Sequence, residues 1–499
     1  MPFQKIIKLT GEKNMKILLL NPPYLDKYSK SSRSPGVAKS GTIYFPLWLS
    51  YAAGVLDKEG HEIKIIDAPA KCMNREETLN ETEKFAPKLI VIDTSTPSIN
   101  SDLLFARLIK EKISGCKICL VGTHVSACVD EILPSNDFVD FIARHEYDYT
   151  LRELAEKIDQ PELFSGIKGI SYVLDGVLVN NPDREYIQNL DELPFVSQVY
   201  KKHLDIKDYF YAHVGYPTIS FFASRGCPSK CIFCVYSQVM FGKKFRKRSA
   251  KNIFDEFIYI TENFPEVKEI LIDDDNFAVD QKNVKDFCNL IIENKVPLKW
   301  TVQVRVTLKY ETMVLMKKAG CKLVVAGFES GNQQILDNMH KGITLEQSKK
   351  FDQSARKAKL RVHGCFMVGN PGETKETMME TLNFSKKLKL DTVQFFPLMV
   401  YPGTEAYNWA QSNNFITVKD YSEWLKKDGM HNSILTTDSL TGEEMVDFCN
   451  YARKKFYLRP KYLFMKLGQV LTNKEDARRT IKAFRTFRKY LFKKNLYKK

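Results

Sequence analysis

Short apolar runs alternate with helical patterns along the first third of the chain. Runs rich in Leu, Ile and Val occupy residues 15–20, 62–66, 89–92 and 117–121, and helix-like periodicity occupies residues 45–56 and 103–112. Such alternation is typical of βαβ units and a parallel sheet. The pattern predicts a doubly wound α/β domain whose strand ends carry loops of small and hydroxylated residues. No GxGxxG sequence occurs, which argues against a dinucleotide-binding fold.

A second alternation of strands and helices runs from about residue 215 to residue 410. Apolar runs at 270–272, 323–326 and 365–368 are each followed by a polar loop and then a helical pattern of roughly 10–15 residues. These units predict another parallel sheet, and ligands of such sheets bind at the carboxyl ends of the strands. The polar or small residues expected at those ends are Asp273, Arg305, Gly327, Glu329, Ser330 and Gly369.

Three cysteines lie close together on one polar loop. Cys227, Cys231 and Cys234 have the spacing CxxxCxxC, and Gly226 and Pro228 mark the loop. Thiolates are the usual ligands of iron–sulfur clusters, so three cysteines can hold three irons of a 4Fe–4S cluster. The fourth iron is then open to a substrate or cosubstrate. Three unrelated core cysteines are the alternative, against which the polar, Gly/Pro-marked loop argues.

The cysteine spacing, with Phe233 just before the last cysteine, resembles the signature of radical S-adenosylmethionine (SAM) enzymes. The resemblance covers residues 215–410 and is carried by the segments 268–277, 300–306, 319–331, 363–373 and 393–404. It implies a partial (β/α)6 TIM barrel, a 4Fe–4S cluster on the three cysteines, and SAM at the open iron. In this family, reductive cleavage of SAM gives a 5′-deoxyadenosyl radical that takes hydrogen from the substrate. An electron donor of the flavodoxin or ferredoxin type is implied as partner.

The same resemblance implies roles for residues near the strand ends. Phe233 is expected beside the adenine, Arg305 near the SAM carboxylate, and Glu329 at the ribose or amino acid part of SAM. The other expected SAM-site residues are Asp273, Gly327, Ser330 and Gly369. For the turn at 369–372, ordinary turn chemistry explains the residues equally well.

The front module resembles the amino-terminal cobalamin-binding domain that precedes a large group of radical SAM enzymes. The matching segments are residues 21–23, 46–49, 67–69, 94–95 and 122–124. The residues expected to contact cobalamin are Asn21, Pro22, Pro23, Leu47, Thr94, Ser95, Gly122, Thr123, His124 and Glu146.

Two departures from the cobalamin-domain pattern limit what it implies. The DxHxxG motif, which supplies a cobalt-ligating histidine in the mutases and methionine synthase, is absent, so cobalt is expected without that histidine. Two roles are open for His124: it could ligate cobalt, or it could form a hydrogen bond within the loop. The usual Gly-Glu turn near position 145 reads Ala-Arg-His-Glu-Tyr here and retains Glu146 alone.

These patterns divide the chain into four parts. Residues 1–155 are the expected cobalamin-binding Rossmann-like domain, and residues 156–214 are a connector with a hairpin at 169–179. Residues 215–410 are the radical SAM core, and residues 411–499 are a helical region with a basic tail. Cys116 and Cys119 resemble a metal-binding pair, but without a second pair they are better interpreted as core thiols.

The positive charge of the chain is concentrated at its carboxyl end. Residues 453–499 hold 17 Lys and Arg against 2 Asp and Glu, which equals the net charge of +15 for the whole chain. Ile481, Phe484, Phe487 and Leu491 recur among these charges at helical spacing. A basic amphipathic helix suits an anionic membrane surface. Packing on the core with a solvated basic face is an alternative, and nucleic acid is the less expected partner.

Other features bear on location. No run of ~18 apolar residues occurs. The first residues lack the long apolar segment of a secretory signal. Eleven cysteines without a framework spacing fit a reducing compartment. We therefore expect a cytoplasmic protein that could associate with a membrane through its basic tail.

Together the two resemblances imply a cobalamin-dependent radical SAM methyltransferase that methylates an unactivated carbon. One SAM would methylate cobalamin, and a second would supply the radical that prepares the substrate. The alternatives are an oxidative cyclase or ring-rearranging enzyme with both cofactors, a methylthiotransferase or RNA modifier, and a non-catalytic cobalamin-binding protein. The methylthiotransferase would need a second three-cysteine cluster, for which the spacing of Cys72, Cys116, Cys119 and Cys128 is unsuited. The substrate, whether a small molecule, a lipid or a peptide, stays open.

Overall fold

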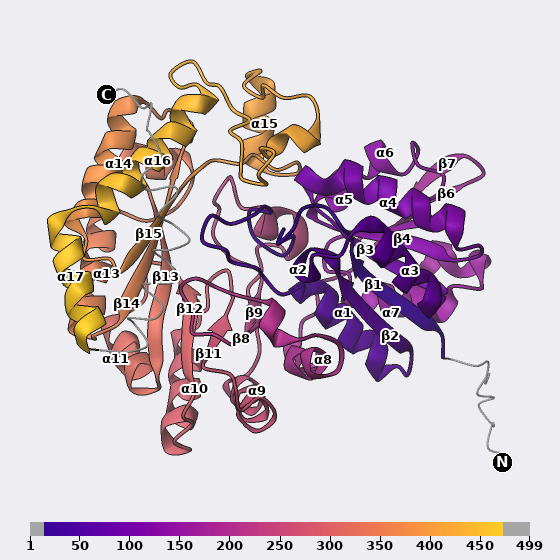
Figure 1. Ribbon diagram of the computed structural model, residues 1–499, viewed down its shortest axis with the longest axis horizontal. Helices are drawn as coiled ribbons and strands as arrows, with labels where there is room; N and C mark the ends of the chain where they lie inside the picture. The colour runs from indigo at the N-terminus through magenta and orange to yellow at the C-terminus, as the bar shows by residue number, and fades with distance from the viewer. Residues whose placement is uncertain (1–13, 473–499) are drawn as a thin grey trace, which may run out of the picture.

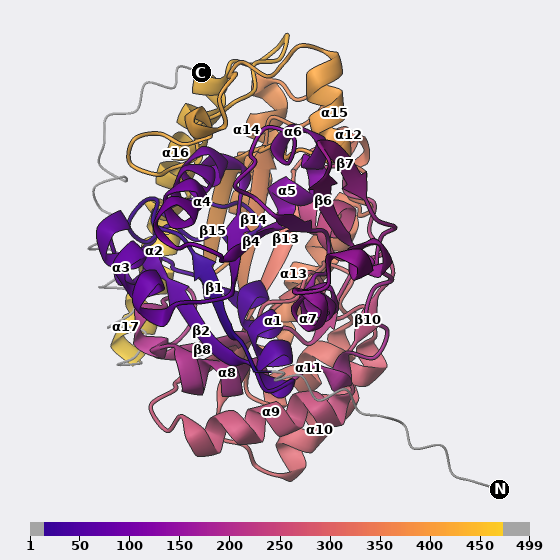
Figure 2. The ribbon, with the colours of Figure 1, turned by 90° about the vertical axis from the view of Figure 1, so that its right-hand side faces the viewer.

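The computed structural model describes residues 14–472, whose helices and strands form two α/β lobes (Figure 1). Residues 1–13 and the basic tail at 473–499 lie outside the described residues, so the amphipathic pattern at 481–491 stays a prediction. The front lobe, drawn in indigo and purple, faces the second lobe across a layer of loops and helices (Figures 1 and 2). Between residues 14 and 472 no helix is long and apolar enough to cross a membrane.

The front lobe contains a seven-stranded sheet in the order β2-β1-β3-β4-β5-β6-β7. Its first five strands are parallel: β1 (Lys16–Asn21), β2 (Glu62–Asp67), β3 (Leu89–Thr94), β4 (Lys117–Gly122) and β5 (Phe141–Ala143). The hairpin predicted from the sequence forms as β6 (Ile170–Leu174) and β7 (Val177–Asn180), and it extends this sheet in antiparallel fashion. The helices of this half are α1 (Leu47–Lys58), α2 (Ala68–Lys71), α3 (Arg75–Phe85), α4 (Ile99–Lys112), α5 (Thr123–Ala127), α6 (Val129–Ile132), α7 (Asp148–Lys157) and α8 (Val196–His203).

The central strands of the front sheet are apolar along their whole length because helices cover both of its faces. Every residue of β3 is buried, and β1 is buried from Ile17 onward. α1 is buried on all sides because it lies between the front sheet and the second lobe. Its Trp48 stacks on Phe222 of the second lobe with ring centroids 4.1 Å apart.

The second lobe contains six parallel strands in the order β15-β14-β13-β12-β11-β8. They are β8 (Thr218–Phe221), β11 (Glu269–Ile272), β12 (Lys299–Val304), β13 (Cys321–Glu329), β14 (Arg361–Val368) and β15 (Thr392–Pro397). The helices between them are α9 (Ala250–Asn263), α10 (Gln281–Glu293), α11 (Tyr310–Lys318), α12 (Gln333–Asn338), α13 (Leu345–Lys357) and α14 (Lys375–Lys387). A short antiparallel pair, β9 (Ser224–Arg225) and β10 (Arg246–Lys247), flanks the cysteine loop. The doubly wound front domain and the partial barrel predicted from the sequence are both confirmed.

After the edge strand β15 the described residues form three carboxyl-terminal α-helices, one of which packs against that strand. They are α15 (Glu405–Ser412), α16 (Gly442–Tyr457) and α17 (Pro460–Thr472). From α16, Arg453 Nη2 donates to the carbonyl of Phe395 at 2.7 Å, and the Tyr457 hydroxyl donates to the carbonyl of Val393 at 2.7 Å. These side chains satisfy backbone groups that an exposed edge strand would leave unpaired.

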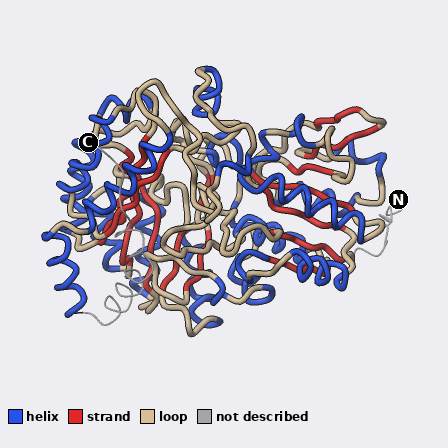
Figure 3. The backbone as a smooth tube through the Cα atoms, turned by 45° about the horizontal axis from the view of Figure 1, so that its top comes forward, coloured by secondary structure: helices blue, strands red, loops and turns tan. Residues whose placement is uncertain are grey.

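A segment without helix or regular strand crosses between the lobes; we call residues 22–46 the strap (Figure 3). The strap leaves the end of β1 and returns at the start of α1. Val37 N donates to the carbonyl of Gly429 at 2.8 Å, and Ile43 N donates to that of Phe210 at 2.7 Å. The strap is therefore bonded to the connector and to the carboxyl-terminal region, while its two ends continue into β1 and α1 of the front lobe.

Candidate active site between the two lobes

The cysteine loop begins at the end of β8, where Asp274 holds its backbone. One carboxylate oxygen of Asp274 accepts from Ala223 N at 2.7 Å, and the other accepts from the Ser224 hydroxyl at 2.6 Å. Further along, Gln238 Nε2 donates to the carbonyls of Cys231 and Ile232 at 3.2 and 2.9 Å. The loop therefore has a defined path that rests on groups outside the cysteines themselves.

The three cysteines of the loop are free thiols. Cys227 and Cys231 are buried, and Cys234 is half-buried. Burial raises the pKa of Cys234 to about 11. Arg305 Nη1 lies 3.7 Å from Cys231 Sγ, so the guanidinium of Arg305 stands directly beside the cysteine loop.

A 4Fe–4S cluster fits this donor set. Across residues 14–472 no three His, Cys, Asp or Glu side chains converge on a point as one metal ion would require. In a 4Fe–4S cluster each cysteine binds a different iron, so its three ligands need no such convergence. Cys227, Cys231 and Cys234 would hold the cluster, and the unligated iron is where SAM would bind.

Glu329 ends β13 in a left-handed backbone conformation with φ of 60°. Its Oε1 accepts from Lys341 Nζ at 2.6 Å, while its buried Oε2 has no hydrogen-bond donor among the described residues. A β-carbon on Gly327 would lie 2.2 Å from Oε1, so only glycine leaves room for this carboxylate. A buried carboxylate oxygen without a donor is a fitting partner for a cationic group such as the amino group of SAM.

The other residues predicted for the SAM site are placed around the same strand ends. Asp273 Oδ1 accepts from Arg33 Nη1 of the strap at 2.9 Å and also accepts from Gln303. The hydroxyl of Ser330 lies 3.1 Å from that of Thr381.

Three further predicted residues have neighbours of a different kind. The Phe233 ring lies 5.8 Å from Lys341 Nζ. Arg305 Nη2 donates to the carbonyl of Lys341, in addition to its contact with the cluster loop. Gly369 N donates to Glu373 Oε2 at 2.9 Å, which is a turn-forming bond.

Lys341 and Arg33 belong to this site although the sequence analysis did not find them. Lys341 is buried beside Glu329, Cys231 and Arg305; burial opposes its charge, yet Glu329 and Cys231 raise its pKa above the usual range. Arg33 lies on the strap and reaches Asp273 and Asp275 of the second lobe. Neither residue is part of a spaced motif, so only the fold brings them here.

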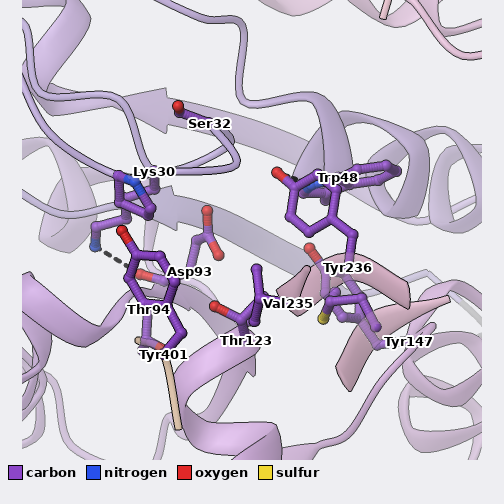
Figure 4. A pocket seen from close by; sticks show the side chains of 13 residues that line it. Lys30, Ser32, Trp48, Asp93, Thr94, Thr123, Tyr147, Val235, Tyr236 and Tyr401 are labelled. Atoms are coloured by element: carbon purple, nitrogen blue, oxygen red, sulfur yellow. Dashed lines mark hydrogen bonds between the residues drawn. The ribbon is translucent and has the colours of Figure 1, made fainter. Parts of the chain in front are cut away.

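A cavity lies beside the cysteine loop, at the carboxyl ends of β3 and β4 (Figure 4). Its front-lobe wall is made by Asp93, Thr94, Gly122, Thr123, Tyr147 and Trp48, with Lys30, Ser32 and Pro35 of the strap. Its opposite wall is made by Val235, Tyr236, Met240 and Tyr401. Val235 directly follows the third cysteine, so the cavity and the cysteine loop share one piece of backbone.

This cavity fits a cobalamin site in its position and its polar lining. Gly122 has φ of 116°, and a β-carbon there would lie 2.3 Å from the carbonyl of Thr94, so the turn requires glycine. The buried hydroxyl of Tyr147 has no hydrogen-bond partner among the described residues, which leaves it available to a ligand. Burial raises the pKa of Asp93 to about 7, and Lys30 Nζ donates to the Asp93 carbonyl at 2.7 Å. Of the predicted cobalamin residues, Thr94, Gly122 and Thr123 line the cavity directly.

The other predicted cobalamin residues surround the cavity without lining it. Asn21 Nδ2 donates to Asp67 Oδ1 at 2.8 Å, and the Ser95 hydroxyl lies 2.8 Å from that of Tyr28. Leu47 N donates to the Ser31 hydroxyl at 3.2 Å. Pro22 and Pro23 are buried at the start of the strap.

His124 makes one loop hydrogen bond, with Nδ1 3.2 Å from the Thr96 hydroxyl. Burial lowers the pKa of His124 to about 3, so the ring is neutral, and its buried Nε2 has no partner among the described residues. The ring packs edge-on against Tyr421 of the carboxyl-terminal region at 4.7 Å.

Glu146 lies in a buried ion-pair network between the lobes. Its Oε1 is 2.8 Å from Arg225 Nη1, and its Oε2 is 2.6 Å from Arg246 Nη1. Arg225 also lies 2.7 Å from Asp148 Oδ2. Both carboxylate oxygens of Glu146 therefore bind arginines that flank the cysteine loop, and this network fixes the orientation of the front lobe to that loop.

These features define a class of protein, a SAM-radical barrel with a cobalamin-binding domain in front of it. Comparison with known families agrees: the radical SAM superfamily matches residues 222–385, and the B12 binding domain matches residues 33–155. The chain is 31% identical to an uncharacterized methyltransferase of Pyrococcus horikoshii, over 90% of this chain and 94% of the relative. The chain thus belongs to the radical SAM superfamily, in the group with a B12 binding domain. Its cofactors are a 4Fe–4S cluster, SAM and cobalamin, as predicted.

Two further similarities are more distant. The chain is 24% identical to the anaerobic magnesium-protoporphyrin IX monomethyl ester cyclase of Rubrivivax gelatinosus, over 90% of this chain and 78% of the cyclase. The solved structure of the radical SAM methyltransferase TsrM from Kitasatospora setae, with cobalamin and a 4Fe–4S cluster bound, has a TM-score of 0.64 at 17% identity. That match covers 81% of this chain and 79% of TsrM and shows the fold.

Proposed function

We propose that this protein is a methyltransferase that transfers a methyl group from SAM, by way of cobalamin, to an unactivated carbon of its substrate. The observation that carries the proposal is the shared wall between the two cofactor sites. Cys234 is a cluster ligand, and Val235 and Tyr236 behind it line the cavity at the ends of β3 and β4. A substrate bound at this wall lies next to both cofactors, which is what hydrogen removal and methyl delivery at one carbon require.

The cofactors supply the hard chemistry, namely homolytic removal of hydrogen and a transferable methyl group. The residues of the chain bind and orient them. Cys227, Cys231 and Cys234 hold the cluster, and Glu329 offers its free carboxylate oxygen to the amino group of SAM. Arg305 is within reach of the SAM carboxylate because its guanidinium already lies beside Cys231. The strap and Tyr401 both line the cavity and thereby limit the access of water to the radical.

The relatives support methyl transfer more than the alternatives. The relative with 31% identity is named a methyltransferase, whereas the ring-forming cyclase is 24% identical. The cyclase is nevertheless similar over 90% of this chain, so a cyclase remains the second candidate. A methylthiotransferase has less support, because Cys72, Cys116, Cys119 and Cys128 of the front lobe lack the spacing of a second three-cysteine cluster. Cys116 and Cys119 are buried, and burial raises the pKa of both thiols.

The test uses SAM with a trideuterated methyl group and the reconstituted enzyme, supplied with an extract of candidate metabolites. A methyltransferase gives a product heavier by the mass of CD3 in place of H, together with 5′-deoxyadenosine. Formation of 5′-deoxyadenosine and an altered product without deuterium would support the cyclase and overturn methyl transfer. If the reconstituted enzyme cleaved no SAM, both candidate functions would be excluded.

Three further expectations belong to this proposal. The reduced cluster needs one electron from a flavodoxin- or ferredoxin-type donor, since no residue of the chain is a reductant of that potential. The protein works in the cytoplasm, where thiols stay reduced. It contacts anionic lipid through its basic carboxyl end, whose charge is attracted to such surfaces.

A further inference from the structure

We infer that Gln394, with His363 and Thr392 behind it, binds an uncharged carbonyl group of the substrate, such as that of an amide. The three residues lie on neighbouring strands, Gln394 and Thr392 on β15 and His363 on β14. The inference rests on the proposed function in calling the ligand a substrate. It adds the chemical class of the group that is recognised.

The two faces of β14 and β15 differ in polarity and in exposure. On the outer face, which α14 and α16 cover, Phe395 is buried (Figure 1). On the opposite face, which we call the inner face, Cys365 pairs with Gln394 and His363 pairs with Thr392. Gln394 is exposed, and the other three side chains are half-buried. Side chains fill the interior of a closed barrel, so accessible polar groups on this inner face indicate room for a ligand.

The inner face points to the connector and to the strap. The ring of His363 lies nearly parallel to that of His213 in the connector, with centroids 5.4 Å apart. The charges of Glu329 and of Arg33 on the strap both act on the Cys365 thiol. This face therefore borders the SAM site.

The strand register sets the distance between Gln394 and the SAM site. Gly327, Cys365 and Gln394 are successive Cα partners on β13, β14 and β15. Neighbouring strands lie about 4.8 Å apart, so Gln394 stands about 10 Å from Gly327. A small molecule held at Gln394 thus reaches the strand end where Glu329 offers its carboxylate oxygen to SAM.

The polar groups of the inner face carry no charge at neutral pH. Burial lowers the pKa of His363 to about 4 and raises that of Cys365 to about 12. A hydrogen bond with Gln394 acts against the effect of burial on His363, as expected where the imidazole N–H donates to the amide oxygen. The other ring nitrogen, Nδ1, then accepts from the Thr392 hydroxyl at 2.7 Å. In this arrangement the amide nitrogen of Gln394 keeps its N–H groups for the carbonyl oxygen of a ligand.

The charged groups around the inner face form ion pairs. These pairs are Arg33–Asp273, Lys341–Glu329 and Arg361–Asp391, with nitrogen–oxygen distances of 2.9, 2.6 and 3.9 Å. With these charges already paired, a charged ligand group would lose its water without gaining a counter-charge. Burial of a neutral group that forms hydrogen bonds costs much less. An uncharged carbonyl is therefore the group that suits this face.

Three flat probes of one shape test this site: benzamide is neutral, benzoate is an anion and benzamidine is a cation. Equilibrium dialysis of the anaerobic holoenzyme measures the dissociation constant of each. We expect benzamide to bind about tenfold more tightly than either charged probe, because a charge must be desolvated. Tighter binding of a charged probe, equal binding of all three, or saturable binding of none would overturn the inference.

The substitution Gln394→Glu locates the probe and reverses its charge preference. It keeps the size of an exposed side chain and adds a carboxylate, so benzamidine should become the tightest of the three probes. The matched control is Gln411→Glu on α15, also at an exposed glutamine, which should bind the probes as the wild type does. An unchanged order of affinities in Gln394→Glu would place the probe elsewhere and contradict the inference.

The supporting role of Thr392 has its own test. Thr392→Val removes the hydroxyl that bonds to His363 and should weaken benzamide binding, whereas Thr392→Ser keeps the hydroxyl and should preserve it. Equal affinities of the two variants would contradict this role. None of these measurements uses SAM turnover. A failed deuterium experiment with intact benzamide selectivity would therefore overturn the reaction and leave the carbonyl site standing.

Discussion

Lys341 connects the groups on which the SAM site depends. Its ammonium group lies 2.6 Å from Glu329 Oε1 and 5.8 Å from the Phe233 ring, and its carbonyl accepts from Arg305. Because the pair with Glu329 is buried, each partner stabilises the charge of the other. Lys341 therefore contacts the carboxylate and the aromatic ring through its ammonium group, and the guanidinium through its backbone carbonyl.

Replacing Lys341 with methionine should destabilise the protein by about 3–5 kcal/mol, because it leaves the Glu329 carboxylate charged and buried without its partner. Urea unfolding of the holoenzyme measures this loss. The matched control is Lys349→Met, which breaks an exposed pair with Glu346 and should cost less than about 1 kcal/mol. Equal losses of unfolding free energy for the two variants would show that the buried pair stabilises the protein no more than the exposed pair does.

Single alanine substitutions at Cys227, Cys231 or Cys234 should each abolish the visible absorbance of the cluster and the cleavage of SAM. The reason is that each thiolate ligates one iron of the cluster. Absorbance spectra and 5′-deoxyadenosine formation are the measurements. Cys72→Ala, at an exposed thiol of the front lobe, should leave both unchanged. Retained SAM cleavage in the cysteine variants would contradict the assignment of these three residues as cluster ligands.

At this scale the sequence predicts residues that belong to spaced motifs. The cysteine spacing and the polar residues after each strand indicate Cys231, Arg305 and Glu329; Arg305 lies beside Cys231, and both Arg305 and Glu329 bond to Lys341. Lys341 and Arg33 were missed because their role depends on distance in space and not along the chain. Glu146 was predicted as a cobalamin contact, but the sequence cannot reveal the two arginines that bind it.

Among the structural elements, β9 and β10 carry the arginines that bind the front lobe. Arg225 on β9 pairs with Glu146 and Asp148, and Arg246 on β10 pairs with Glu146. All four side chains are almost fully buried, so solvent and salt screen the network little. The short pair β9–β10 thus couples the cysteine loop mechanically to the front lobe.

Arg225→Met should lower the unfolding free energy by about 3–5 kcal/mol, since it leaves two buried carboxylates with less positive charge. Limited proteolysis should also cut the connector faster. Lys251→Met is the control: it breaks an exposed pair with Asp255 within α9, which contributes about 0.3–0.5 kcal/mol. If Arg225→Met behaves like this control, the network does not hold the lobes together.

Helix α17 exposes an apolar face just before the basic tail. Leu463, Phe464, Leu467 and Leu471 are 51–78% exposed. We expect the double substitution Phe464→Ser and Leu467→Ser to reduce sedimentation with phosphatidylserine vesicles at low salt, because apolar side chains anchor amphipathic helices. Leu104→Ser, at an exposed leucine of the front lobe, is the control. Unchanged sedimentation of the double variant would exclude α17 as a membrane contact.

Helices and strands with a clear hydrophobic periodicity could be predicted from the sequence, whereas irregular segments could not. The predicted strand at 117–121 and helix at 103–112 appear as β4 and as the greater part of α4. The strap has neither the period of a helix nor that of a strand, so its path between the lobes was not foreseen. The hairpin at 169–179 was predicted, but its membership of the front sheet depends on pairing with β5, which has only three residues.

Across the whole molecule, several carboxyl groups are buried with neutral partners. Burial raises the pKa of Asp67, Asp274 and Glu373 to about 7 in each case. A carboxyl group whose pKa is higher in the folded state binds more protons there than in the unfolded chain. Its contribution to stability is therefore complete below pH ~4 and is lost as the pH rises through 7.

The unfolding free energy of the holoenzyme should accordingly decrease between pH 5 and pH 8, as urea midpoints at fixed ionic strength would show. Asp67→Asn should reduce this decrease, because the amide keeps the size of the side chain and does not ionise. The control Asp428→Asn removes an exposed carboxyl group and should leave the slope unchanged. The assignment of these raised carboxyl pKa values would be contradicted if the unfolding free energy of the wild type rose between pH 5 and pH 8. It would also be contradicted if Asp67→Asn left the pH dependence unchanged.

The arrangement of the two lobes is the part that the sequence could not provide. Each lobe follows from its own periodicity, but their contact depends on side chains such as Trp48 and Tyr51 that read as ordinary core residues. Tyr51 accepts from Phe222 N at 3.1 Å across the junction. Only the folded chain distinguishes such residues from those that pack within a lobe.

The backbone that carries Cys234 also carries Val235 and Tyr236 of the cavity wall, and this has a thermodynamic consequence for loading the enzyme. Whatever factor cobalamin introduces into the affinity for SAM, SAM must introduce into the affinity for cobalamin. The final occupancy of the two cofactors is then independent of the order in which they arrive. Where that factor strengthens binding, a cell short of one of them holds less of the other on this protein as well.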